Sequence, residues 1–501
     1  MAPAEEMCAG RLLSVGLIKE IELVNSRLEG ERIPVARLRA LWTALKARPL
    51  LLVPVWVWRW LVPVAAGGAV GAVVAALVPD VLPAVAAGLV AGGVAVALQT
   101  AEPDGSLAPL ADEELHRLVA EVAAELGVRR PRRVCAWARP DALAVRVAPW
   151  RDELRLGLPY LTEMHRDELR AVVAFELALL ALRRSPLAYA LHRWWLTDSW
   201  RWRTVPDEVE AAVDGMFRSA DAAAARVAGV PGCASALLRG GLITNSFIWF
   251  AGWYGGMAVM AGGFSPDLYA NWRWKARHDG LLTAFVRTVA QADSSASPTG
   301  RIAAVTGEEP ATVAARIAAL TAADVAAPMM GVVVGERPAA TADGVGVQTA
   351  DAGSAVLAGG LPEQVETRLA RAWTREVHTR PAARAVPLRE VPDRTWDEVY
   401  EGERAEVLAA ARVLLGRREA TSQDVVDLAR AGRAGELAWD HLGSLCSHGD
   451  PAVCVLYPVL HRQLREAGHA YAHPLARRIL IAPDGTRVDV AAHAAEIAAA
   501  T

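Results

Sequence analysis

The pattern of apolar and polar positions separates an apolar segment near the start of the chain from a longer region with mixed helix and strand patterns. Residues 1–47 are polar, with apolar positions at roughly helical spacing. Within residues 48–100, bare apolar runs extend from Trp60 to Val78 and from Val81 to Leu98. Each run matches the roughly 20 residues that a membrane-spanning helix needs. The pattern therefore predicts an N-terminal arm followed by a transmembrane helical hairpin.

Charges beside the hairpin predict its orientation. The turn between the two runs, at Pro79 and Asp80, carries no basic residue, whereas both flanks are basic. The flanking residues are Arg32, Arg37, Arg39, Lys46 and Arg48 before the hairpin, and Arg117, Arg129, Arg130, Arg132 and Arg133 after it. Because basic flanks stay in the cytoplasm, we expect a multi-pass cell-membrane protein with cytoplasmic N- and C-terminal parts and the lipid bilayer as a partner. The alternative is a buried hairpin of a soluble protein, which two uncharged runs disfavour.

Residues 101–325 have the pattern of a folded domain with few strands. The predicted elements are helices at 113–126 and 166–182 and strands at 134–137 and 153–158. A second apolar stretch, at 240–264, also contains Thr, Asn, Ser and Gly residues. We therefore expect an interfacial or core helix there rather than a further membrane anchor.

The last third of the chain predicts a separate small domain. Residues 326–361 are rich in Gly, Ala, Val and Thr without clear periodicity, which is typical of a linker. Residues 362–501 carry helical patterns at 403–415 and 455–467, and a hairpin pattern at 478–490. The expected fold class is therefore mainly α with a small β-sheet, followed by a small, mostly helical C-terminal domain that ends in a hairpin.

Composition excludes several function classes. The mean hydropathy is +0.21, which agrees with a membrane segment, and the net charge of -3 gives no general reason to bind nucleic acid. The 5 cysteines include no CxxC pair, so a reducing compartment is expected. Cysteines and histidines do gather between Cys446 and His473, but their spacing matches no zinc finger. No GxSxG elbow or Gly-rich phosphate loop is present.

Two segments resemble a known family of enzymes. Residues 154–184, LRLGLPYLTEMHRDELRAVVAFELALLALRR, resemble the core of the M48 zinc metallopeptidases, in which a strand and a loop lead into a helix bearing HExxH. Residues 217–229, FRSADAAAARVAG, are similar to the second helix of that family, which carries ExxAD. The order of elements over residues 49–320 is similar to that of integral-membrane actinobacterial members. The resemblance implies a zincin-like α+β core within residues 101–325.

The zinc ligands of that family are replaced in this chain. In HExxH, two histidines four residues apart share one helix face and bind zinc, and the glutamate between them activates a metal-bound water. Phe175 and Leu179 stand at the histidine positions, and Phe217 stands at the position of the third ligand, a glutamate. None of these side chains has a lone pair for a metal, so we expect no zinc and no other cofactor. Only Glu176 and Asp221 remain of the implied catalytic residues.

Nearby residues do not supply obvious replacement ligands. His165 lies ten residues before Phe175 and therefore about 15 Å away along a helix. His192 lies beyond Pro186, which should end or bend the helix, so we do not expect it near the site. Asp214, one helical turn before Phe217, is the best substitute carboxylate.

The function that these patterns favour is a membrane-anchored pseudopeptidase that acts as a binding, scaffold or regulatory protein. A peptide or protein partner would then bind at the former active-site cleft. The alternative is an enzyme, either a membrane metallopeptidase with non-standard ligands and bound zinc, or different chemistry in the cleft around Glu176 and Asp221. A further expectation is that Phe175, Leu179 and Phe217 lie close together while Glu176 faces an opening beside them.

Overall fold

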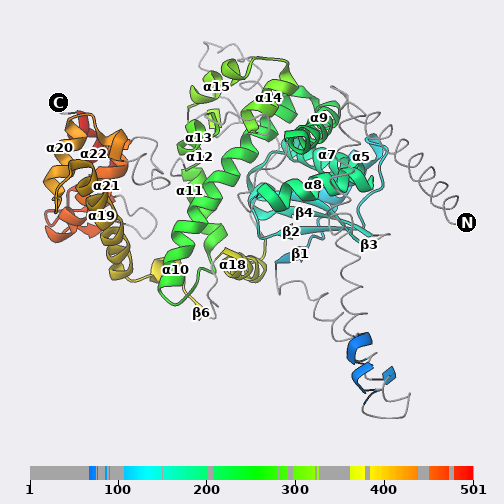
Figure 1. Cartoon of the computed structure of the whole chain (residues 1–501), viewed down its shortest axis with the longest axis horizontal. Helices are drawn as coiled ribbons and strands as arrows, with labels where there is room; N and C mark the ends of the chain where they lie inside the picture. The colour runs from blue at the N-terminus through cyan, green and yellow to red at the C-terminus, as the bar shows by residue number, and fades with distance from the viewer. Residues whose placement is uncertain are drawn as a thin grey trace, which may run out of the picture. The chain divides into compact units, whose positions relative to one another are not determined.

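A computed structural model of the chain forms two compact units. The first comprises residues 1–244 and 289–360, and the second comprises residues 245–288 and 361–501. The residues that the structure describes are 67–70, 72–74, 76, 85–86, 90, 106–148, 151–199, 207–278, 281–290, 297–321, 324–325, 361–377, 384–437, 451–472 and 479–499. Helices predominate over short strands in both units (Figure 1), as the predicted fold class requires.

The first unit contains a four-stranded sheet. Its strands are β1 (Leu107–Pro109), β2 (Arg133–Trp137), β3 (Ala142–Ala148) and β4 (Arg151–Gly157). The spatial order is β1-β2-β4-β3; β2 and β4 are parallel, and each outer strand is antiparallel to its neighbour. The parallel pairing matches Arg133 with Glu153 and Trp137 with Gly157, so these four side-chain positions lie on one face. In this strand order β3 lies at one edge of the sheet.

Helices cover the opposite face of this sheet. α5 (Glu113–Glu125) begins where the Asp112 carboxylate accepts a hydrogen bond from the Leu115 amide at 2.7 Å. α6 (Leu158–Glu163) follows β4 directly, and α7 (Arg166–Leu182) packs against both α5 and β3 (Figure 1). At the start of α6, a Cβ on Gly157 would lie 2.3 Å from the Arg139 carbonyl oxygen. Only glycine permits this close passage of β4 beside the segment before β3.

The chain then forms a second set of helices in the first unit. α8 (Pro186–Ser199) follows α7 after a short turn. α9 (Asp207–Phe250) is interrupted at Gly229, whose φ of 78° lies in the left-handed region, two residues before Pro231. α14 (Pro298–Thr306) and α15 (Pro310–Ala318) complete the described helices of this unit. α14 starts at Ser297, whose side chain accepts from the Gly300 amide.

The second unit begins at Asn245, near the end of α9. A π-helical turn, η2 (Ala251–Gly255), continues α9 into α10 (Gly256–Met260), and the chain proceeds to β5 (Gly263–Phe264) and α11 (Leu268–His278). α12 (Leu281–Ala284) and α13 (Val286–Ala290) are short. α11 is joined to α18 (Glu363–Val377) by two hydrogen bonds from Arg273 to Glu366, at 2.7 and 3.0 Å. Phe247, Tyr269, Trp272 and Trp373 form the aromatic core of this part.

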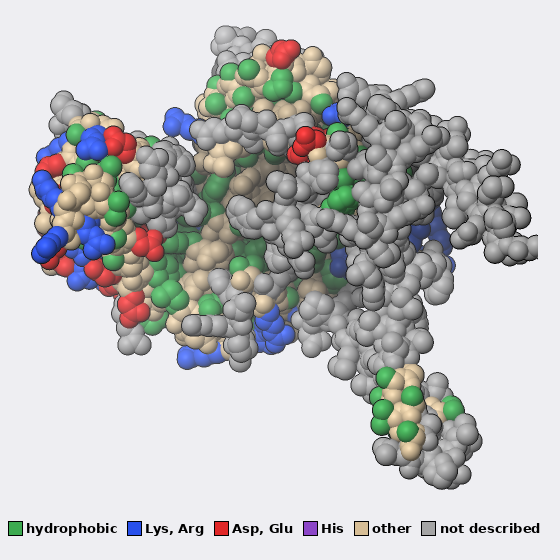
Figure 2. Space-filling view, in the orientation of Figure 1, with side chains coloured by type: hydrophobic (Ala, Val, Ile, Leu, Met, Phe, Trp, Pro, Cys, Tyr) green, Lys and Arg blue, Asp and Glu red, His purple; other side chains and the backbone are tan. Residues whose placement is uncertain are grey.

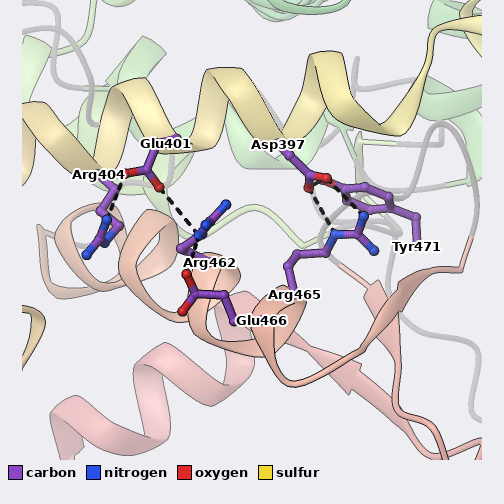
Figure 3. A network of polar contacts seen from close by, with 7 residues as sticks. All are labelled: Asp397, Glu401, Arg404, Arg462, Arg465, Glu466 and Tyr471. Atoms are coloured by element: carbon purple, nitrogen blue, oxygen red, sulfur yellow. Dashed lines mark hydrogen bonds and ion pairs between the residues drawn. The ribbon is translucent and has the colours of Figure 1, made fainter.

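The C-terminal part of the second unit is a small helical domain. Its elements are β6 (Arg384–Ala385), which pairs with β5, η3 (Leu388–Glu390), α19 (Asp393–Leu415), α20 (Ser422–Arg430), α21 (Pro451–Glu466), β7 (Ala470–Tyr471), β8 (Ile479–Ile481), β9 (Arg487–Asp489) and α22 (Val490–Ala499). Polar contacts join α19 to α21 and β7 (Figure 3). Arg465 donates two hydrogen bonds of 2.9 Å to Asp397, and the Tyr471 hydroxyl donates to the same carboxylate at 2.9 Å.

Several predicted elements match the structure closely. The predicted helix at 166–182 has the bounds of α7, and the predicted hairpin at 478–490 contains β8 and β9. Residues 240–260 of the apolar stretch at 240–264 belong to the one described helical segment, Val209–Met260, that is long and apolar enough to cross a membrane, whereas its end forms β5. More than half of its most apolar window is buried, which agrees with the expected core helix. The sequence interpretation missed β3, whose alternating Leu143 and Val145 precede β4.

Three predicted segments lie largely or wholly outside the described residues. The predicted arm at 1–47 and most of the hairpin at 48–100 belong to this part, as does the linker at 326–361 apart from Leu361. Within the hairpin, residues 67–70, 72–74, 76, 85–86 and 90 are described, and all of them are helical. Residues 245–288 group with the C-terminal part in the second unit.

Candidate functional site

The three predicted ligand positions lie together between α7 and α9. Phe175 and Leu179 are one helical turn apart on α7, and Phe217 lies on the facing part of α9. The centroids of the Phe175 and Phe217 rings are 6.0 Å apart, with the rings tilted by 48°. Both rings pack against a buried cluster composed of Leu179, Leu182, Ala188, Met216 and Ala220. The expected proximity of the three residues is therefore confirmed.

An arginine from α14 lies beside this aromatic pair. The Arg301 guanidinium carbon is 4.4 Å from the centroid of Phe175 and 5.8 Å from that of Phe217. A cation over an aromatic face is attracted by the negative charge density of the ring. The same guanidinium donates to both oxygens of Asp221, at 2.9 and 2.6 Å. Burial, the largest single effect, would lower the pKa of Arg301. The charge of Asp221 and its hydrogen bonds together have a larger opposite effect, so the pKa is raised.

Asp221 is thus occupied by a two-point ion pair. The residue is only 2% exposed, so the loss of hydration on burial must be offset by these bonds. The Cys233 thiol, also buried, donates to the Asp221 carbonyl oxygen at 3.7 Å. Burial and the nearby Asp221 raise the pKa of this thiol to about 12, so it remains protonated. Asp221 therefore joins α9 to α14.

Glu176 does not face an opening, and that part of the prediction is wrong. Its side chain is buried and accepts a hydrogen bond of 2.8 Å from the Ala144 amide of edge strand β3. Arg183, at the end of α7, lies 3.8 Å from the same carboxylate. Burial raises the pKa of Glu176, although Arg183 and the Ala144 amide act in the opposite direction. A carboxylate among apolar side chains requires such partners, and here they come from the strand and from the end of its own helix.

The fold brings His192 back to this centre, contrary to expectation. The turn after α7 allows Pro186 to start α8, and the His192 ring then lies 6.1 Å from Phe217 in an edge-on orientation. Pro186 does end the preceding helix, but proline also fits the first turn of a new one. Burial, together with the charge of Arg183, lowers the pKa of His192 to about 3, so the imidazole is neutral at physiological pH.

Tyr160 forms a further buried polar contact in the first unit. Its hydroxyl lies 3.1 Å from the Thr244 hydroxyl, which in turn donates to the Pro140 carbonyl oxygen at 2.7 Å. Burial raises the pKa of Tyr160 to about 12, so it remains a neutral phenol. The contact links α6, α9 and the segment before β3. Its geometry serves packing between these elements.

The residues at the centre do not fit a zinc ion. Phe175, Leu179 and Phe217 offer no donor atom, and His165 is the residue that precedes the first turn of α7, remote from this pair. Over the described residues, no group of three or more His, Cys, Asp and Glu side chains could hold a metal ion. Of the C-terminal cysteine and histidine cluster, Cys454 and His461 are buried in α21. The centroids of the His461 and Tyr400 rings are 3.8 Å apart, with the rings tilted by 36°.

Comparison of the chain with protein-family models, with curated proteins and with solved structures finds no match.

Proposed function

We propose that this chain is a membrane-anchored, non-catalytic relative of the M48 metallopeptidases, a pseudopeptidase that serves as a binding or scaffold protein. The observation that carries the proposal is the apolar packing of Phe175 and Phe217, with Leu179 in the same cluster. These are the positions at which the family resemblance places the metal ligands. A peptidase of this type needs a zinc-bound water whose pKa is near ~7 rather than ~15.7. Side chains without donor atoms cannot provide it.

The remaining polar groups also favour a structural role. Asp221 is paired with Arg301 at two points, and Glu176 is bonded to the Ala144 amide and lies near Arg183. A general base must reach a substrate proton with a free lone pair. Because both carboxylates are directed at protein partners, the alternative of other chemistry around Glu176 and Asp221 has less support.

The Glu176 contact also bears on the kind of partner. An extended peptide can add to a sheet by hydrogen bonds with an edge strand. On β3, however, the Ala144 amide already donates to Glu176, near the middle of the strand. A peptide could use that amide only if Glu176 moved away. A scaffold role, in which the partner binds surfaces rather than the old cleft, is therefore favoured.

Exposed apolar residues support the membrane anchor. In the described part of the predicted hairpin, helical residues Val70, Val73, Val85 and Val90 are 39–67% exposed. Figure 2 shows hydrophobic side chains on the surface of this part. Helices that expose valines in this way are typical of contact with lipid rather than water. Together with the basic flanks, this supports a multi-pass anchor with cytoplasmic N- and C-terminal parts.

The test restores the ligands of the family. The triple variant Phe175→His, Leu179→His, Phe217→Glu should gain zinc affinity if the two helices descend from a peptidase core, since the replaced side chains already lie in one cluster. The Arg301 guanidinium opposes a dication at this place, so adding Arg301→Gln should tighten binding further.

A matched control places glutamine at the same three positions, which removes the apolar packing to a similar degree without supplying imidazole or carboxylate ligands. Zinc affinity, measured by calorimetry on the full chain in detergent, should rise in the restored variants and not in this control. Absence of zinc binding by both restored variants, when they remain folded, would contradict descent from a peptidase.

A further inference from the structure

One face of the four-stranded sheet carries three arginines that the proposed function does not explain. Arg133 on β2 and Arg151 and Arg155 on β4 lie on one face, because residues two apart on a strand point the same way and Arg133 is matched with Glu153. α7 packs against β3 on the opposite face, where Ala144 meets Glu176. The three arginines are thus gathered on the face that α7 does not cover.

A single carboxylate organises these arginines. Glu153 is fully buried, and its oxygens lie 2.9 Å from Arg155, 3.7 Å from Arg133 and 3.7 Å from Arg151. Arg155 is further fixed by the Trp137 ring, whose centroid is 6.0 Å from the guanidinium carbon. One buried carboxylate is thus shared by three guanidinium groups.

The adjacent carboxylate on β4 does not join this group. Asp152 points to the other face and is shared by Arg146 at 3.0 Å and Arg184 at 3.7 Å. Arg133 and Arg151 are 34% and 43% exposed, so their outward N–H groups are accessible. A guanidinium has five N–H donors in a planar fork, and one shared carboxylate uses only a few of them.

We propose that Arg133, Arg151 and Arg155 form a seat for a phosphate group, and that the phosphate is that of an anionic phospholipid headgroup. Phosphate oxygens match the guanidinium fork, and arginines pre-organised by a buried carboxylate lose little freedom on binding. The predicted span ends at Leu98 and the sheet begins at Leu107. Even a fully extended chain between these residues is at most about 30 Å long, which limits the distance of the sheet from the span. The assignment of the phosphate to a lipid rests on the proposed membrane anchor, whereas the phosphate seat does not.

The test is native mass spectrometry of the full chain in uncharged detergent, titrated with phosphatidylglycerol, phosphatidylcholine or inorganic phosphate. Phosphatidylglycerol should bind more tightly than the other two. Arg133→Gln and Arg151→Gln should each weaken it about fivefold. Arg417→Gln, which alters an exposed arginine paired with Asp424, should leave it unchanged.

Three outcomes would overturn the proposal in different ways. Equal affinity of the wild type and the Arg133→Gln/Arg151→Gln double variant for phosphatidylglycerol would remove the seat. Equal affinity for phosphatidylcholine would show that headgroup charge is irrelevant. Inorganic phosphate that binds as tightly as the lipid would assign the seat to free phosphate and remove the lipid source. Since both arginines are partly exposed, their replacement by glutamine should leave the fold intact, and no outcome depends on zinc.

Discussion

The α7–α9 centre and the α19–α21 contact both join helices through arginine and carboxylate groups, yet they differ in hydration. In the centre, Asp221 and Glu176 are buried beside Phe175 and Phe217, and burial raises the pKa of Glu176. In the C-terminal domain, Asp397 is 28% exposed. Burial would also raise the pKa of Asp397, but the hydrogen bonds from Arg465 and Tyr471 have the larger combined effect and lower it.

This difference indicates what each region is suited for. The charges of the α19–α21 contact in Figure 3 are partly exposed, so water can replace a lost partner at little cost, and they align the helices without being indispensable. Charges in an apolar centre have no water to replace a lost partner, so each must remain paired. A site that performs hydrolysis needs the opposite arrangement, with a free base and a metal. The centre therefore has the properties of a structural junction.

The largest effect is expected from Asp221→Asn. This change leaves the Arg301 guanidinium buried without its carboxylate and should lower the free energy of unfolding by about 3–5 kcal/mol. Native-state hydrogen exchange of the α7 and α9 amides measures it. The double variant Asp221→Asn/Arg301→Gln should recover part of the loss. A loss no greater than that of Asp397→Asn would break the comparison between the two regions.

An intermediate effect, dependent on pH, is expected at His192. Its pKa is about 3 in the folded chain and 6.5 as the reference value, so the unfolded chain takes up a proton first as the pH falls. The stability associated with neutral His192 is therefore complete above pH 6.5. It is lost below that pH at about 1.4 kcal/mol per pH unit until the folded value is approached.

The variant His192→Phe should remove this acid sensitivity while keeping an aromatic ring beside Phe217. Unfolding measured between about pH 7 and about pH 4.5 should show a smaller decline for the variant than for the wild type. Parallel declines would mean that His192 is hydrated or already charged, against the burial on which the interpretation of the centre depends.

The smallest effect is expected from Asp397→Asn. The pKa of Asp397 is lowered from 3.8, so its contribution is present above that pH and is lost as the pH falls through the folded value. Because the group is partly exposed, we expect a cost of only about 1 kcal/mol at neutral pH. Hydrogen exchange in α19 and α21 should show this difference at neutral pH and none once the pH is below the folded value. A loss as large as that of Asp221→Asn would contradict the contrast in hydration.

Local patterns predicted much of the fold. The helical period from Arg166 to Leu182 and the Pro483-Asp484-Gly485 turn determine α7 and the β8–β9 hairpin through short-range interactions. The close packing of Phe175, Leu179 and Phe217 was also expected, because the resemblance related two helices that are distant in sequence. The strand β3 was missed because its short Leu and Val alternation is diluted by alanine.

The partners of the charged residues could not be predicted in this way. Asp221 meets Arg301 across 80 positions, and Glu176 meets Ala144 across 32. Neither pairing leaves a trace in local periodicity, since the partners come together only when α14 and β3 pack on the helices. His192 was likewise misjudged, because Pro186 can both end α7 and begin α8, and the sequence alone does not give the angle between them.

The central claim is that Phe175, Leu179 and Phe217 form no metal site, and elemental analysis tests it most directly. The full chain, purified in detergent without chelators and with zinc supplied during expression, should contain no stoichiometric zinc, because Phe175, Leu179 and Phe217 have no donor atoms. Zinc that followed Cys446 or Cys454 on substitution would belong to the C-terminal domain and leave the claim intact. About one zinc per chain, lost on substitution of Glu176 or Asp214, would contradict it.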